Sequence, residues 1–97
     1  MKNLFDRNYE AVVNRGLITS KTSHEDFKSK LYEELAEVND EIPPLGSGLD
    51  YLAEELGDLI VVCTNYLQWM RYDPEKILEQ IAEKNEKICS SIFLSVS

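Results

Sequence analysis

Two pairs of acidic residues have the clearest potential for chemistry in this sequence. Glu34 and Glu37 lie three residues apart in one stretch with helical apolar periodicity, and Glu55 and Asp58 repeat that spacing in the next stretch. Residues at i and i+3 lie on one face of a helix, one turn apart. Carboxylates, with water and phosphate oxygens, are the ligands that Mg²⁺ and Mn²⁺ prefer. If the two stretches pack together, the four carboxylates converge on one spot.

Helical-wheel positions favour that convergence. At about 100° per residue, Glu34 lies roughly 20° from Phe27, at the border of an apolar stripe. Glu55 falls inside the wide apolar arc of the following stretch, and Asp58 lies at the edge of that arc. A carboxylate that faces a core without a partner is strongly destabilising unless it is protonated. Four such groups repel one another unless a cation lies among them.

A charged surface is the alternative interpretation. Acidic pairs at i, i+3 often face solvent or form ion pairs one turn away, and Lys30 has the spacing to pair with Glu34. The spacing leaves both interpretations open, and the place of Glu55 inside the apolar arc favours the metal site. Zinc is not expected, because neither pair is accompanied by a histidine or cysteine at ligand spacing. The one histidine, His24, is expected on the surface at the start of a helix.

The last periodic stretch contains a second polar anomaly. Asn85 falls on the apolar side of that stretch, and Lys84 and Lys87 flank it. One interpretation is a buried, hydrogen-bonded asparagine that fixes helix register. The other is an amide and two ammonium groups directed at the phosphates of a ligand. The aromatic residues Tyr51, Tyr66 and Trp69 are expected in the core.

Four helices are expected to position these side chains, in an all-α fold. They cover residues 2–15, about 23–40, 50–71 and 74–89. Gly16 ends the first helix, and either Thr22 with Glu25 or Ser23 with Asp26 has the spacing of a capping box for the second. Short loops predict antiparallel neighbours, as in a helical bundle. For the tail, residues 90–97, the pattern leaves open a short strand, a helix end or a frayed terminus that packs on a neighbour.

Length and composition limit the classes of function. The chain has 97 residues, so residues 1–97 are expected to form a single domain, and a core this thin favours a homo-oligomer. Eighteen acidic and ten basic side chains give a formal charge of −8. That charge argues against a nucleic-acid polymer or an anionic membrane as partner. It leaves a phosphorylated small molecule open, because a metal ion inverts the local charge.

The expected location is the cytoplasm. The longest apolar run, residues 59–63, is far shorter than the roughly 20 residues that cross a bilayer. The first residues have no apolar segment typical of a signal peptide. Cys63 and Cys89 do not form a CxxC motif and are expected to be reduced, buried thiols.

The ordered acidic pairs resemble a known family. Glu33-Glu34-Leu35-Ala36-Glu37 and, after it, Glu55-Leu56-Gly57-Asp58 are similar to the E-x-x-E and E-x-x-D motifs of MazG-like nucleoside triphosphate pyrophosphohydrolases. These enzymes belong to the all-α NTP pyrophosphatase superfamily. Seventeen residues separate the two motifs, and the resemblance covers about residues 27–88.

The resemblance implies a Mg²⁺-dependent hydrolase, with Mn²⁺ as a substitute metal. It would cleave a nucleoside triphosphate between the α- and β-phosphates, as a step in cleaning the nucleotide pool. By position, the metal ligands would be Glu34, Glu37, Glu55 and Asp58, with Glu34 or Glu37 also orienting the attacking water. Contacts to the phosphates would come from Lys30, Lys84, Asn85 and Lys87. Family members build the site from more than one subunit, which implies a homodimer or a homotetramer made of two dimers.

Two other functions fit the same residues. One is a phosphoribosyl-ATP pyrophosphohydrolase, and the other is a non-catalytic helical oligomer that binds a nucleotide or a partner helix. The tail also departs from the family, because residues 90–97 lack the basic side chains that commonly follow the last helix. Phosphate contacts from that end are therefore in doubt, and the preferred base and sugar are undetermined.

Overall fold

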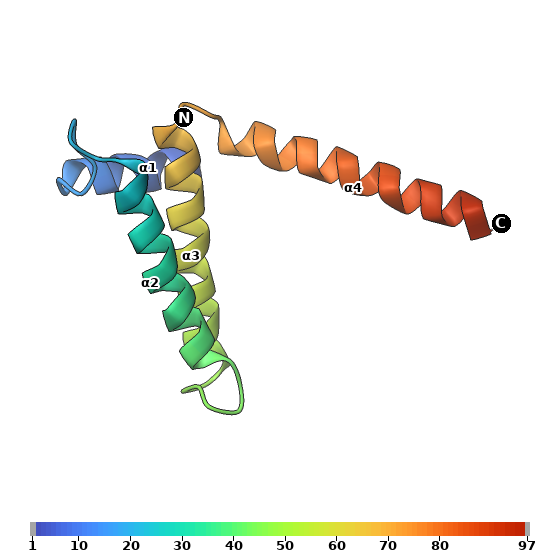
Figure 1. Cartoon of the computed structure of the whole chain (residues 1–97), viewed down its shortest axis with the longest axis horizontal. Coiled ribbons are helices and arrows are strands. Elements are labelled where there is room, and N and C mark those ends of the chain that lie inside the picture. The colour runs from blue at the N-terminus through green and yellow to red at the C-terminus, as the bar shows by residue number, and fades with distance from the viewer. Residues whose placement is uncertain (1, 97) are drawn as a thin grey trace.

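The described part of the chain folds into four helices without a strand. A computed structural model describes residues 2–96, with side chains described for residues 2–88. The helices are α1 (Leu4–Asn14), α2 (His24–Glu41), α3 (Leu49–Trp69) and α4 (Pro74–Val96), coloured from blue to red in Figure 1. The prediction of an all-α fold with four helices is confirmed.

An antiparallel pair of helices, α2 and α3, forms the centre of the molecule. The capping box at the start of α2 is present: the Ser23 side chain accepts from the Asp26 backbone N–H, and the Asp26 carboxylate accepts from the Ser23 backbone N–H. The loop between the helices is closed by Glu41, whose carboxylate accepts a 2.8 Å hydrogen bond from the Ser47 N–H. Gly46 lies against the backbone of Glu41, so closely that a Cβ at this position would overlap it. This loop returns α3 along α2 (Figure 1).

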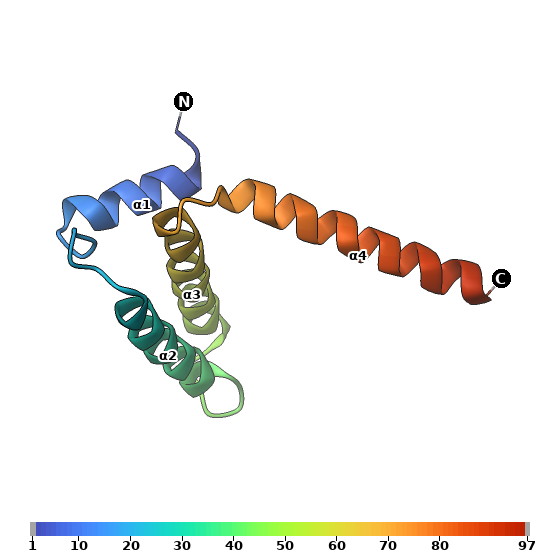
Figure 2. The same ribbon diagram turned by 45° about the horizontal axis from the view of Figure 1, so that its top comes forward.

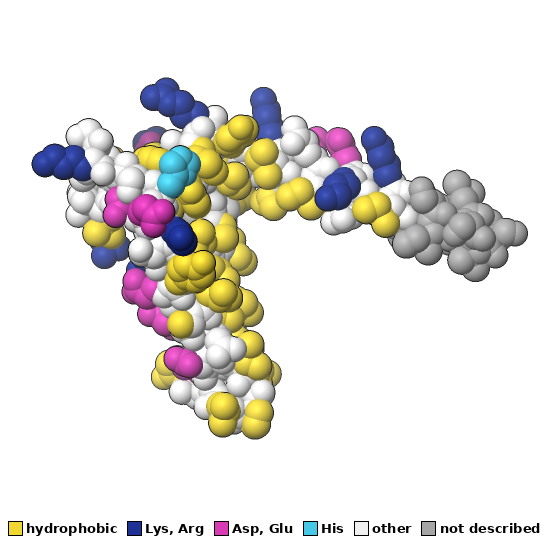
Figure 3. All heavy atoms as spheres, in the orientation of Figure 1, with side chains coloured by type: hydrophobic (Ala, Val, Ile, Leu, Met, Phe, Trp, Pro, Cys, Tyr) yellow, Lys and Arg dark blue, Asp and Glu magenta, His cyan; other side chains and the backbone are white. Residues whose placement is uncertain are grey.

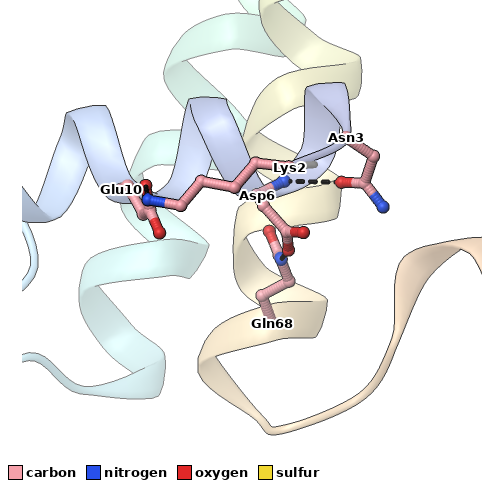
Figure 4. A network of polar contacts seen from close by, with 5 residues as sticks. All are labelled: Lys2, Asn3, Asp6, Glu10 and Gln68. Carbon is pink, nitrogen blue, oxygen red and sulfur yellow. Dashed lines mark hydrogen bonds and ion pairs between the residues drawn. The ribbon is translucent and has the colours of Figure 1, made fainter.

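Helix α1 crosses the upper end of this pair (Figure 2). Asn3 caps it by accepting a 2.9 Å hydrogen bond from the Asp6 N–H. The Asp6 carboxylate in turn accepts a 2.9 Å hydrogen bond from the Gln68 amide of α3 (Figure 4). Lys2 forms a 2.6 Å ion pair with Glu10 on the outer side of the helix. The bond from Gln68 fixes α1 to α3, so α1 and the pair act as one packing unit.

The two ends of α3 and the end of α4 differ from the sequence prediction. Gly48, at φ 131°, is the N-cap residue of α3, so the helix begins at Leu49 and the expected cap at Asp50 is wrong. After α3, Arg71 adopts the left-handed region at φ 71°, and Asp73 then accepts a 3.0 Å hydrogen bond from the Glu75 N–H at the start of α4. Helix α4 continues to Val96, so the tail is a helix end rather than a strand.

The expected bundle is not completed within one chain. Helix α4 extends away from the other three helices after the turn at Arg71 (Figures 1 and 2). Large apolar side chains on α3 and α4 are therefore exposed, among them Ile60, Leu78, Ile81 and Ile88. Figure 3 shows apolar side chains on both sides of the open angle between α3 and α4. The thin core expected from the chain length is present.

An aromatic cluster joins the upper ends of α2 and α3. The Phe27 ring stacks on Tyr66 with centroids 4.5 Å apart, and the Trp69 centroid lies 5.2 Å from that of Phe27. His24 is exposed, as predicted, and its Nδ1 lies 2.6 Å from the Tyr66 hydroxyl. Tyr51 is exposed within the chain, so its expected place in the core is wrong. It lies near the start of α3.

The last expectations to compare with the structure concern the two cysteines and the length of the apolar helices. Cys63 is a free thiol but exposed rather than buried, because it lies on the face of α3 that no other helix of the described chain covers. The side chain of Cys89 lies outside the described residues. Within the described residues, none of the helices combines the length and the apolar character needed to cross a membrane.

Candidate metal centre

Carboxylates from α2 and α3 meet at the middle of the helix pair. Glu34, Glu55 and Asp58 each offer one carboxylate oxygen, and these oxygens lie within 4.8 Å of one another. Glu33, Glu34 and Glu37 form a second such group along α2. Both groups share Glu34, so they form one continuous acidic cluster. This is the arrangement that the i, i+3 spacing requires when two helices pack with their acidic edges together.

Burial makes this cluster different from an acidic surface. Glu34 is only 6% exposed, although a carboxylate is rarely buried without compensation. Within the described residues, Glu34 Oε2 and Glu55 Oε2 are buried and accept no hydrogen bond. Buried polar atoms without a partner are uncommon and destabilising. The two oxygens therefore form a place where a cation would be stabilising.

Lys30 partly compensates the negative charge. Its ammonium lies 3.1 Å from Glu34 Oε1 and 3.3 Å from Glu33 Oε1. The pKa of Lys30 is raised, chiefly by the hydrogen bond to Glu34. The ion pair predicted from the i, i+4 spacing is therefore present, and it coexists with the acidic cluster. One lysine is insufficient for four or five carboxylates, so the cluster keeps a net negative charge.

The proton affinity of Glu37 reflects this excess charge. Its pKa is raised to about 7, first by a side-chain hydrogen bond with Glu55 and then by the negative charge of Glu34. A hydrogen bond between two carboxyl groups needs a proton, which is why this contact raises the pKa of Glu37. Without a cation, the cluster relieves its repulsion by binding a proton.

A pocket of about 470 Å³ adjoins the cluster. Glu34 and Asp58 line it together with Lys30, so the acidic cluster and the pocket are continuous. Its volume is in the range of small-molecule sites. Most of its wall is apolar and comes from α1, α2, α3 and the segment after α1: Val12, Leu17, Ile18, Phe27, Val61 and Val62.

Four polar residues of this pocket were not among the predicted site residues: Arg15, Thr22, Asp26 and Asn65. Asn65 is only 4% exposed, and among the described residues its Oδ1 has no hydrogen-bond partner. Arg15, just after α1, lines the pocket from another side. A signal for Asn65 existed, because it follows Asp58 by seven residues and so lies about 20° from it on the helical wheel. No comparable signal existed for Arg15, since it lies in a different segment.

The predicted phosphate-binding residues of α4 lie apart from the cluster within one chain. Lys84, Asn85 and Lys87 are exposed on α4, which extends away from α2 and α3 (Figure 1). Asn85 is therefore not a buried, register-fixing residue in the described chain. Its role toward phosphates stays a prediction. Of the four predicted phosphate contacts, Lys30 is the one that the structure places beside the carboxylates.

Comparison with known protein families gives a match over the region that contains the acidic cluster. A family model described as the MazG nucleotide pyrophosphohydrolase domain matches residues 22–93. The match spans α2 and α3 with all the clustered carboxylates, and most of α4. No curated protein and no solved structure matches the chain. Helix α1 precedes the matched region.

Proposed function

Since this chain belongs to the MazG nucleotide pyrophosphohydrolase family, we propose that it hydrolyses nucleoside triphosphates in a Mg²⁺-dependent reaction. Water would add across the anhydride between the α- and β-phosphates, giving a nucleoside monophosphate and pyrophosphate. Cleaning of the cytoplasmic nucleotide pool is the role that this reaction would serve. The observation that carries the proposal is the acidic cluster with two buried, unpartnered carboxylate oxygens.

The donor set of this cluster fits Mg²⁺ or Mn²⁺. All its ligand atoms are carboxylate oxygens, which hard divalent cations prefer. The orphaned oxygens of Glu34 and Glu55 point to a missing positive partner. We assign Glu34, Glu37, Glu55 and Asp58 as the residues that would hold it. When bound, such an ion neutralises phosphate charge and makes water a better nucleophile.

The acidic side chains and Lys30 would have different roles toward the attacking water and the phosphates. Glu34 is buried, whereas Glu37 is exposed and so accessible to water. Glu37 is therefore the better candidate to orient the water and accept its proton, and Glu34 is the alternative. The water oxygen forms a bond to phosphorus as the bridging P–O bond breaks, and pyrophosphate leaves. Lys30, at the rim of the cluster, would contact the phosphates.

Further phosphate contacts would require a second copy of the chain. Lys84, Asn85 and Lys87 lie on α4, whose apolar side chains have no cover in the described chain. We propose a homodimer, or a homotetramer made of two dimers, in which α4 packs on a partner and brings these residues to its acidic cluster. Burial of the exposed apolar faces would drive that association.

Product identification tests the reaction. The full chain is incubated with Mg²⁺ and a panel of ribo- and deoxynucleoside triphosphates, and the products are separated by ion-exchange chromatography. Monophosphate with pyrophosphate is the expected result. Diphosphate with phosphate would mean that a different bond is cleaved. An absence of turnover across the panel, and with phosphoribosyl-ATP, would favour a nucleotide-binding role over an enzyme.

Replacing one carboxylate tests the site. Asp58→Asn should lower kcat/KM by at least about 100-fold, because a lost ligand should affect metal binding at least as much as a lost supporting contact. Asp50→Asn is the matched control, since Asp50 lies on the same helix, exposed and outside the cluster. Circular dichroism checks that both variants stay helical. Full activity in Asp58→Asn would contradict the site assignment.

A further inference from the structure

The pocket between α1, α2 and α3 has features of a nucleobase site. We propose that it takes the nucleoside of the substrate and that the Asn65 amide hydrogen-bonds the edge of the base. This inference rests on the proposed function for the identity of the ligand. It adds a specificity residue, Asn65, that lies outside the acidic motifs.

The pocket extends from the acidic cluster in one direction. On α3 it is lined from Asp58 to Asn65, and on the antiparallel α2 from Glu34 past Phe27 to Asp26. Asp58 and Asn65 are separated by seven residues, as are Glu34 and Phe27, which corresponds to about 10 Å along each helix axis. That length is comparable to a nucleoside with its 5′-phosphate. A triphosphate held at Glu34 and Asp58 would therefore place its base beside Asn65 and Phe27.

The far end combines apolar wall with polar groups, as suits a flat group with a polar edge. Phe27 and Val62 contribute apolar wall, and Asn65 is the buried amide beside them. Asp26, the neighbour of Phe27, also lines the pocket. The unpartnered Asn65 Oδ1 needs a hydrogen-bond donor, because a buried acceptor without one is destabilising. A base provides such a donor as an amino group or a ring N–H. An amide also offers N–H groups, so it can discriminate between base edges.

The first experiment measures base preference. For the wild type, Asn65→Leu and Thr64→Val, kcat/KM is determined with Mg²⁺ for the four deoxynucleoside triphosphates. Asn65→Leu keeps the approximate shape and removes the amide. We expect it to change the ratio of kcat/KM between the best and worst base by about tenfold or more, because one base contact discriminates at that level.

Thr64→Val is the matched control. Thr64 is equally buried on the same helix, but its hydroxyl donates to the Val61 carbonyl within α3 and does not line the pocket. The control should keep the wild-type ratio between bases. An equal loss for all four nucleotides in Asn65→Leu would show a structural role only and would overturn the inference. So would an unchanged ratio.

A second experiment needs no hydrolysis. The side-chain amide signal of Asn65 is followed by NMR in the full wild-type chain with Mg²⁺, and Asn65→Leu identifies it. We expect at least one of the four deoxynucleoside 5′-monophosphates to shift this signal, and ribose 5-phosphate to leave it in place. An equal shift with ribose 5-phosphate would assign the contact to the sugar and overturn the base contact. No shift with any monophosphate would also overturn it.

The two experiments separate this inference from the proposed function. A chain that binds a monophosphate at Asn65 but hydrolyses no triphosphate would contradict the proposed reaction and keep the base site. A chain that hydrolyses triphosphates with the same base ratio in Asn65→Leu would keep the reaction and lose the base site.

Discussion

Burial separates the four predicted metal ligands into two kinds. Glu34 is buried and Glu55 is half-buried, whereas Glu37 and Asp58 are exposed. The helical wheel predicted this in part, because it placed Glu34 at the border of an apolar stripe and Glu55 inside an apolar arc. It did not predict the proton affinity of Glu37, which depends on the distance between two helices. A wheel describes directions around one helix and contains no distances between helices.

The raised pKa of Glu37 makes metal-free stability depend on pH. The ordinary value is 4.5 and the folded value is about 7, so the folded state holds this proton more tightly than the unfolded state. The favourable contribution is present below pH 4.5 and is lost as the pH rises toward about 7. We expect the unfolding temperature in EDTA to fall across that window, and to fall less steeply in Glu37→Gln.

Parallel curves for the two proteins would contradict that expectation. Glu79→Gln, which removes a carboxylate from α4 outside the cluster, is the control and should follow the wild type. Excess Mg²⁺ should raise the wild-type unfolding temperature most at the alkaline end of the series, where the carboxylates are ionised. No response to Mg²⁺ at any pH would count against a cation at the cluster.

Local signals predicted the starts of α2 and α4 better than the end and the direction of α4. The capping box of α2 was one of two candidates predicted from residue types, and the start of α4 at residue 74 was predicted as well, because caps act within one turn. The end of α4 was not predictable, since its apolar tail fits a strand or a helix equally well by composition. The direction of α4 depends on Arg71, whose left-handed conformation is uncommon for a residue with a side chain.

The capping box allows a prediction at the level of the helix. Ser23→Ala should lower the free energy of unfolding by about 1 kcal/mol, because the Asp26 N–H loses its side-chain acceptor. Ser29→Ala is the control, since Ser29 is exposed inside α2, where alanine is the better helix former. Urea denaturation followed by circular dichroism measures both. Equal stability of the two variants would mean that the cap contributes nothing.

The whole molecule leaves apolar surface that its own chain does not cover. Ile81 is 45% exposed, and Leu78 and Ile88 share its side of α4. The sequence predicted which side of α4 is apolar, but it did not predict what covers that side. Burial against the same chain and burial against a second copy produce the same periodic pattern. This is why the sequence did not predict that α4 extends away from the other three helices of its own chain.

The exposed face of α4 allows a prediction about assembly. Light scattering after size exclusion should give a mass of two or four times the 11.2 kDa of one chain for the wild type. Ile81→Glu should shift the mass toward one copy, because a charge on the apolar face opposes its burial. Gln80→Glu adds the same charge on the flank and should keep the wild-type mass. A monomeric wild type would contradict the proposed oligomer.

The attachment of α1 has a consequence for how this protein changes over evolutionary time. Helix α1 precedes the family-matched region, is fixed to α3 through the Asp6–Gln68 hydrogen bond, and supplies Val12 to the pocket wall. The acidic cluster belongs to α2 and α3 alone. Mutations in α1 can therefore reshape the wall of the pocket without altering a carboxylate of the cluster. Under the proposed function, such a division would let ligand preference diverge between descendants while the metal ligands stay unchanged.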